Sequence, residues 1–282
     1  MRKTKKLLCL CLAAVMAFCF TGCGGDKTPN NDDGSVKDNQ SVSASLSEDN
    51  FEWDGNVIIA LTETGAKQKA IVIPERCEGF NGMIFADTEN DITSVSFESN
   101  KDIKLNGVFG SAAKIKSIDL PDQLTTIGDL EFWLCAALEE IEVPASVTTI
   151  GKYAFQDNTN LKKILFAGNI EIIKAHAFDG CSSLNTVTMP DTVSQIDEYA
   201  FYECTSLKAV TLPKSLKTVG AFAFANSGLV DITVPSELVL DEYATTSFVQ
   251  ADHDINIHLT EGSWMDQNFG SVFNGAYNKQ YN

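Results

Sequence analysis

The chain has 282 residues, of which 44% are hydrophobic, enough to enclose a substantial core. Its 38 acidic residues outnumber its 21 Lys and Arg residues, so the formal net charge is −17. Nucleic-acid binding requires clustered positive charge to contact phosphates, and this composition excludes nucleic acid as the expected partner. An acidic surface favours solubility and singles out no particular partner.

The first 22 residues have the pattern of an export signal. Four basic residues precede an apolar run from Leu7 to Phe20. A helix that spans a bilayer needs about 20 apolar residues, so this run is too short to be one. The run ends in Phe20-Thr21-Gly22-Cys23, which resembles the lipobox of bacterial lipoproteins, although that family usually has Leu where this chain has Phe20.

The lipobox resemblance implies that a peptidase cuts before Cys23 and that the sulfur of Cys23 carries diacylglycerol. Such an anchor holds an exported protein at the outer face of the cell membrane, exposed at the cell surface. The alternative is an ordinary secretory signal that is cut near Gly22. Residues 24–50 are rich in Gly, Asp, Asn and Ser, with little to bury, so residues 23–50 are predicted to form a lipidated, disordered tether.

A repeat of about 23 residues, within the range of known repeat architectures, organises the chain between Pro121 and Pro235. Several columns of residues keep the same phase over five copies, which is the mark of such an architecture. The columns are Phe132, Phe155, Phe178 and Phe201; Ile127, Ile150, Ile173, Ile196 and Val219; and the turn residues Pro121, Pro144, Ala167, Pro190 and Pro213.

One repeat unit cannot enclose its own apolar side chains, whereas stacked units cover each other and share backbone hydrogen bonds. The sequence therefore predicts a repeat solenoid of the leucine-rich-repeat kind, with eight or nine coils of about 23 residues. Each coil should contain a strand that stacks parallel on its neighbours, a proline turn and a short helical turn, giving a mainly β fold with minor α. The rings of Phe155, Phe178, Phe201 and Phe224 should then form one internal column.

The two ends of the solenoid are less regular than its middle, as expected for terminal repeats that face water. The solenoid is predicted over residues 51–260, with amino-terminal cap coils at 51–97, regular repeats at 98–234 and a last coil at 235–260. Trp53 and the segment Val57–Leu61 are expected to close the amino-terminal end. Residues 261–282 are expected to form a carboxy-terminal cap or tail that folds over the other end.

The repeat resembles the BspA-like class of bacterial leucine-rich repeats. The resemblance is carried by Pro144-Ala-Ser-Val-Thr-Thr-Ile-Gly-Lys-Tyr-Ala-Phe155 and by Cys181-Ser-Ser-Leu184, and it covers roughly Phe51 to Thr260. It implies coils that are mostly extended. It also implies a surface protein associated with adhesion to host or cell-surface macromolecules, whereas the periodicity by itself predicts only the shape.

The eight cysteines do not have the spacing of a zinc site. Cys135, Cys181 and Cys204 occupy one column, and the last two should lie close enough for a disulfide. The alternative is that they are small buried thiols that fill the core slot which Asn158 fills in another coil. Cys77 has no obvious partner.

No motif for catalysis, nucleotide binding or a cofactor is present, so the chain is not expected to be an enzyme or to hold a cofactor. His176 is expected to pack on the surface. His253 and His258 should lie on opposite faces of a strand, which weighs against a metal role for either. Trp133 is the best candidate for an exposed aromatic side chain.

The outward face of the stacked strands is the remaining candidate for a binding site. It reads as a hydroxyl-rich strip with an acidic patch near its middle and without aromatic anchors. Thr and Ser also suit exposed strands in general, so the pattern is compatible with a face that has no ligand. The candidate binding residues are Glu140, Glu142, Lys163, Thr186, Thr188, Thr211 and Thr233.

Two functions remain open at this point. The first is a lipid-anchored surface protein, expected to be a monomer, which binds or adheres to an extracellular or cell-surface protein or glycan. The second is a structural or assembly component of the cell envelope without a dedicated ligand. A solute-binding lipoprotein would need two α/β lobes, and the repeats exclude it.

Overall fold

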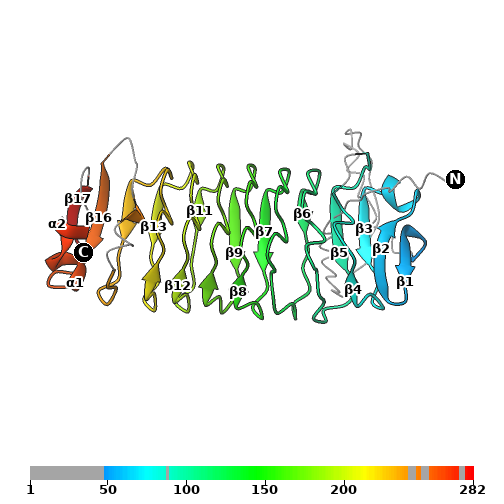
Figure 1. The fold of residues 1–282 in the computed structure, drawn as a ribbon, viewed down its shortest axis with the longest axis horizontal. Helices are drawn as coiled ribbons and strands as arrows, with labels where there is room; N and C mark the ends of the chain where they lie inside the picture. Colours follow the sequence, from blue (N-terminus) through cyan, green and yellow to red (C-terminus); the bar gives the residue numbers. More distant parts are fainter. Residues whose placement is uncertain (1–47, 87–88, 241–245, 249–253, 273–276) are drawn as a thin grey trace, which may run out of the picture.

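The computed structural model describes residues 48–86, 89–240, 246–248, 254–272 and 277–282. The export signal, Cys23 and almost all of the proposed tether lie outside the described residues. The described chain is an elongated solenoid of about nine turns, with the amino terminus at one end and the carboxy-terminal elements at the other (Figure 1). The prediction of a solenoid built from stacked coils of one repeat each is therefore confirmed.

The first strand of each regular coil belongs to what we call the main series, in which neighbouring strands run parallel. It is divided into three hydrogen-bonded sheets, β3-β5-β6, β7-β9-β11 and β13-β15-β16-β17. Residues one repeat apart pair in register, as Ile141 does with Ile164 and Ile164 with Val187. The strands are β3 (Ala70–Ile73), β5 (Ser94–Phe97), β6 (Ser117–Ile118), β7 (Glu140–Val143), β9 (Lys163–Phe166), β11 (Thr186–Val187), β13 (Ala209–Thr211), β15 (Asp231–Thr233), β16 (Ile255–Leu259) and β17 (Tyr277–Tyr281).

A second series of short strands stacks along the lower edge of the solenoid in Figure 1. Four of these strands form one parallel sheet in the order β14-β12-β10-β8, and again equivalent residues of neighbouring coils pair in register, as Ile150 does with Ile173. The strands of this second series are β4 (Gly79–Phe80), β8 (Thr149–Ile150), β10 (Ile172–Ile173), β12 (Gln195–Ile196) and β14 (Thr218–Val219).

The two ends of the solenoid differ from the regular coils. At the amino-terminal end, β1 (Phe51–Asp54) and β2 (Val57–Leu61) form an antiparallel hairpin, flanked by the 3₁₀ turns η1 (Glu48–Asn50) and η2 (Gly65–Lys67). At the other end lie two short helices, α1 (Trp264–Gln267) and α2 (Phe269–Val272), followed by β17. Strand β17 adds to β16 in parallel, so the segment after residue 260 extends the sheet, which its sequence does not predict.

A column of stacked phenylalanine rings runs through the core. Neighbouring ring centroids are 5.0–5.6 Å apart and the ring planes lie within 5–20° of each other. The predicted column of Phe155, Phe178, Phe201 and Phe224 is confirmed, and further rings continue it in both directions. Its members are Phe85, Phe109, Phe132, Phe155, Phe178, Phe201, Phe224 and Phe248.

The turns explain why the coils contain so little helix. The N–H of Asn158 donates to the carbonyl of Phe155 (3.3 Å) and that of Leu161 to Asn158 (3.0 Å), which is the expected three-residue spacing. The segment does not continue as a helix, because Asp157 lies in the left-handed region (φ 59°). After the strands, Pro144 accepts the N–H of Val147 at 3.1 Å and closes the predicted proline turn.

The cysteines of the core are thiols, which decides between the two interpretations of the sequence. Cys181 donates to the carbonyl of Phe155, on the preceding coil, at 3.1 Å. Asn158 fills the equivalent slot and donates to the carbonyl of Phe132 at 2.7 Å. At four successive coils the column therefore supplies a small donor for a buried carbonyl of the preceding coil, from Cys135, Asn158, Cys181 and Cys204. The free, buried cysteines among the described residues are Cys77, Cys135, Cys181 and Cys204.

Glu131 is an exception in this apolar core. The four following coils have Ala at its position, yet the Glu131 side chain is buried, with 1% of the residue exposed. Its Oε2 accepts the N–H of Gly107 at 3.0 Å. Burial raises the pKa of the Glu131 carboxyl to about 7, against the lowering effect of the backbone N–H groups of residues 107–109.

Replacing Phe178 by Ala should lower the free energy of unfolding by about 3–5 kcal/mol, because a buried ring is lost from between two others. Phe222→Ala is the control, since the Phe222 ring is stacked but only half-buried, and it should cost clearly less. Denaturant titration followed by circular dichroism measures both. Equal costs would contradict a stability that depends on the internal column.

Replacing Glu131 by Gln should change how stability depends on pH. The folded protein holds the Glu131 proton up to a pKa of about 7, whereas the ordinary value is 4.5. The contribution of Glu131 to stability is therefore greatest below pH 4.5 and falls as the pH rises to about 7.

Gln does not ionise, so the stability of Glu131→Gln relative to the unchanged protein should rise across this window by about 3 kcal/mol. Denaturant titrations at a series of pH values give this difference directly. A difference that stays constant with pH would show that the Glu131 carboxyl is not perturbed.

Candidate functional site

The outward face of the main series carries the candidate binding residues. Successive side chains of a strand point to opposite sides, so those beside the buried Ile141, Ile164, Val187 and Val210 face solvent. Thr233 is half-buried and the other six candidates are exposed. The seven residues placed on this face are Glu140, Glu142, Lys163, Thr186, Thr188, Thr211 and Thr233.

Acidic residues gather near the middle of this face, as the sequence predicts. Glu140 lies in register with Lys163, and Glu142 lies in register with the exposed Leu165. The pKa of the Asp119 carboxyl is raised by partial burial and by the negative charges of Asp122 and Glu142. The structure therefore brings carboxylates of neighbouring coils close enough to repel one another.

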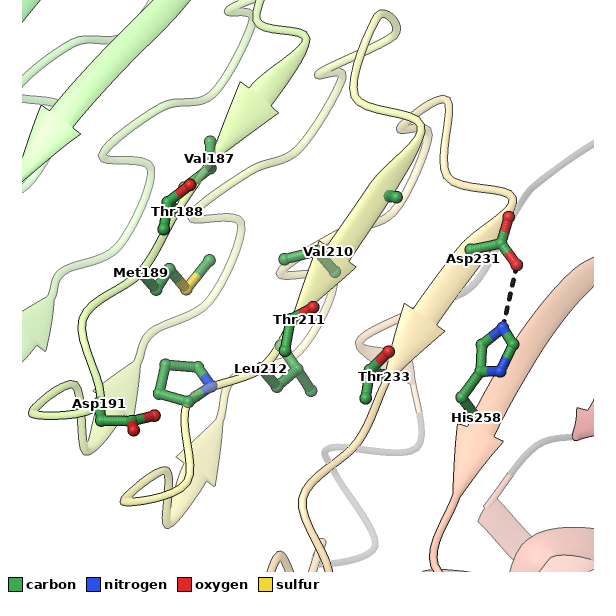
Figure 2. A pocket seen from close by; sticks show the side chains of 12 residues that line it. Val187, Thr188, Met189, Asp191, Val210, Thr211, Leu212, Asp231, Thr233 and His258 are labelled. Carbon is green, nitrogen blue, oxygen red and sulfur yellow. Dashed lines mark hydrogen bonds and ion pairs between the residues drawn. The ribbon is translucent and has the colours of Figure 1, made fainter. Parts of the chain in front are cut away.

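A groove of about 500 Å³ lies on the same face and crosses β11, β13, β15 and β16. Figure 2 shows Thr188, directly after β11, beside Thr211 on β13 and Thr233 on β15. Asp191 lies at one end of the row, and Asp231 and His258 lie at the other. Three of the seven predicted residues thus line one groove. Glu140, Glu142 and Lys163 lie on preceding strands, and Thr186 lies on β11 but is not part of the lining.

The Asp231 carboxylate is held in place by its neighbours. His258 Nε2 and Asp231 Oδ1 are 3.0 Å apart, and Asn256 Nδ2 donates to the same oxygen at 3.2 Å. The bond with His258, followed by that with Asn256, lowers the pKa of the Asp231 carboxyl. Asp231 is therefore a stable negative charge at one end of the groove at neutral pH.

Sequence reasoning did not find the pairing of His258 with Asp231, because the repeat length changes between these coils. The alternating strand Ile255–Leu259 contained the signal, since it places Asn256 and His258 on one face. In the structure Asn256 pairs with Asp231 and His258 pairs with Thr233 in register. His253, which was predicted to lie on the opposite face, is outside the described residues.

The other single residues considered from the sequence do not join the groove. Trp133 is half-buried in a turn. His176 stacks between the rings of Tyr153 and Tyr199, with centroids 4.8 Å apart on both sides, and its Nδ1 lies 2.9 Å from Asp179 Oδ2. This arrangement agrees with the predicted surface packing of His176.

The groove offers hydroxyl and carboxylate oxygens, which suit non-covalent recognition of a polar ligand by hydrogen bonds. Within the described ranges, no group of three or more His, Cys, Asp or Glu residues is placed to hold a metal ion. In the same part of the chain, no helix has the length and apolarity that crossing a bilayer requires.

Solved structures with a similar fold include a leucine-rich repeat protein from Bacteroides ovatus, which is 20% identical with a TM-score of 0.53. That alignment covers 82% of this chain and 65% of the other, so this chain spans less than two thirds of its length. The pneumococcal vaccine antigen PcpA is 15% identical, with a TM-score of 0.44 and coverage of 78% and 82%. A leucine-rich cell surface protein from Faecalibacterium prausnitzii is 19% identical, with a TM-score of 0.30 and coverage of 78% and 86%.

A comparison with curated proteins gave no match. The family model described as the BspA type leucine-rich repeat region matches this sequence with six copies, over residues 64–185 and 171–262. These matches cover more than half of the chain and coincide with the stacked coils of the structure. The chain belongs to the family of BspA type leucine-rich repeat proteins.

Proposed function

We propose that the protein is a non-catalytic, lipid-anchored cell-surface module that binds a protein or glycan through the outward face of its main series. The observation that carries this proposal is the groove in which the hydroxyls of Thr188, Thr211 and Thr233 are aligned across neighbouring coils. A carboxylate lies at each end of the row, that of Asp191 at one end and that of Asp231 at the other.

The geometry of the groove favours an extended polar ligand. Parallel strands repeat about every 4.8 Å, so the threonine hydroxyls present donors and acceptors at a regular spacing. Each hydrogen bond adds little net free energy, and binding would depend on several of them together. Buried apolar residues, including Val210 and Leu212, also line the groove and hold the strands beneath it rigid.

The charge of the face supports a partner that carries hydrogen-bond donors or positive charge. The acidic patch around Glu142 lies on the same face as the groove, and Asp231 is kept ionised by His258 and Asn256. Complementary charge steers association and disfavours acidic competitors. The adhesive role is consistent with membership of the BspA type repeat family.

The surface location rests on the lipobox at Phe20-Thr21-Gly22-Cys23 and on the polar segment that follows it. A diacylglycerol on Cys23 would hold the chain at the membrane, and the proposed tether would let the solenoid stand away from it. We propose this as the route by which the binding face meets its partner.

Changing Thr211 to Arg should reduce binding to cells, or to a panel of matrix proteins and glycans, by about tenfold, because a long charged side chain fills the groove. Thr148→Arg is the matched control, since Thr148 is exposed, directly precedes β8 and does not line the groove. Surface plasmon resonance or a glycan array measures the change.

If Thr148→Arg reduced binding as much as Thr211→Arg did, the groove would not be the site. If the unchanged protein bound to nothing on intact cells or on the panel, the result would favour a structural or assembly component of the envelope without a ligand.

Changing Cys23 to Ala should abolish incorporation of a palmitate analogue and release the protein from the membrane fraction, because the acylated sulfur is lost. Cys19→Ala is the control, since Cys19 lies within the apolar run of the signal. Metabolic labelling followed by fractionation measures both. Retained label in Cys23→Ala would remove the proposed anchor.

A further inference from the structure

The stack of coils has a seam between the coil that contains β6 and the coil that contains β7. The main series is interrupted here, since β6 and β7 belong to different sheets. The second series is interrupted at the same junction. Lys104 pairs with Gly79 of the preceding coil, and Ile127 pairs with Ile150 of the following coil, but no described pairing joins Lys104 to Ile127. No other junction of the regular block interrupts both series in the described chain.

Some of the backbone hydrogen bonds that link other coils are missing at the seam, although those from Ser111 to Trp133 and from Glu139 to Lys116 still cross it. One coil later, the N–H of Gly151 donates to the carbonyl of Ile127, and this pattern recurs at each of the next three coils. No such bond from Gly128 to Lys104 is formed in the described chain. Gly107 donates to the side chain of Glu131, where other coils use a backbone carbonyl.

A cavity of about 320 Å³ lies at the seam, and we call it the seam slot. Glu131 lines it together with Asp102, Lys104 and Asp129. Asp102 accepts hydrogen bonds from the N–H and hydroxyl of Thr125, and Asp129 accepts the N–H of Lys152. The lining residues therefore carry three carboxylates and one ammonium group, so the slot has an excess of negative charge.

The Glu131 carboxyl is the feature of the slot that suits a cation, because Glu131 lines the slot and its carboxyl is only partly paired. Glu131 Oε1 is buried and has no hydrogen-bond partner in the described part of the chain. A buried carboxylate oxygen without a donor is costly, and a bound cation with N–H groups would offset that cost. Burial already raises the pKa of this carboxyl to about 7, and a bound cation would lower it again.

We propose that the seam slot binds an organic ammonium group, with the buried Glu131 carboxylate as its counter-ion. A divalent metal ion suits the slot less well, because it requires several oxygen ligands, and no described group of three acidic residues is placed to hold one. A primary ammonium group needs only acceptors for its three N–H donors. The ammonium group can belong to a free amine or to a lysine side chain of a partner protein.

The seam slot and the groove are separate sites. The slot is lined by residues 102–107 and 125–131, whereas the groove is lined by residues from β11 onward. Loss of binding at one site therefore does not predict loss at the other. A negative result for the seam slot would leave the proposed function of the groove untouched, and the reverse also holds.

The test is calorimetric titration of the full chain, solubilised in non-ionic detergent, with propylammonium chloride at pH 7. Saturable binding is expected, with release of about half a proton per ligand, because a carboxyl with a pKa near 7 loses its proton when the cation binds. Titrations in two buffers with different ionisation enthalpies measure the released proton. Tetramethylammonium has the same charge without N–H donors and should bind at least about tenfold more weakly.

Glu131→Gln should lose the binding and the proton release, and circular dichroism checks that it folds. Glu131→Ala is the second variant, because it places at this position the residue type that regular coils have there, as at Ala154 and Ala177. Lys104→Gln should bind at least as well as the unchanged protein, because it removes a competing positive charge. Glu140→Gln on the strand face is the matched control and should bind normally.

Four results would overturn the proposal: no saturable binding, an equal response to tetramethylammonium, unchanged binding by Glu131→Gln, or binding that appears only in Lys104→Gln. The last result would mean that the ammonium group of Lys104 itself serves Glu131. If propylammonium binds, a short peptide with one lysine, compared with its acetyl-lysine form, distinguishes the sources of the ammonium group. Binding of the first peptide alone indicates a partner protein, and binding of neither indicates a small amine.

Discussion

The stacking of each coil on the next is the interaction on which the rest of this structure depends. No single coil encloses its apolar side chains, and the column from Phe85 to Phe248 is buried only because rings about 5 Å apart cover each other. The same spacing brings parallel strands into hydrogen-bonding distance. It also carries the buried donors of the cysteine column to the carbonyls of the preceding coil. Packing, backbone pairing and the satisfaction of polar groups therefore all repeat with one period.

That period explains how much could be predicted from the sequence. Columns of equivalent residues, one repeat apart, predict the solenoid, the parallel pairing, the proline turns and the column of rings, because each depends only on equivalence between coils. They also predict which side chains face outward, including Thr188, Thr211 and Thr233. Features that depend on a departure from the repeat were not predicted. In the sequence, Glu131 is one acidic residue among many. Its burial is evident only in the structure, where it lies at the seam.

The carboxy-terminal part of the site was missed for the same reason. The repeat length changes after Thr233, so the pairing of His258 with Asp231 does not follow from counting residues. The segment Tyr277–Tyr281 lacks the repeat pattern altogether, yet it extends the sheet by one strand. Where the period holds, the scaffold presents short polar side chains at a regular spacing, and a binding site needs only a suitable choice of residue at each outward position.

The seam also affects how the solenoid unfolds. In a solenoid the coupling between adjacent coils sets how much of the chain unfolds as one unit. Both strand series are interrupted between β6 and β7, so fewer strand hydrogen bonds link the coils there, while the ring contact of Phe109 with Phe132 and the hydrogen bond from Ser111 to Trp133 remain. We expect the coils on the two sides of this junction to differ in when they unfold. Local unfolding of the coils before the seam would then leave the row of Thr188, Thr211 and Thr233 intact, because these residues lie beyond the seam.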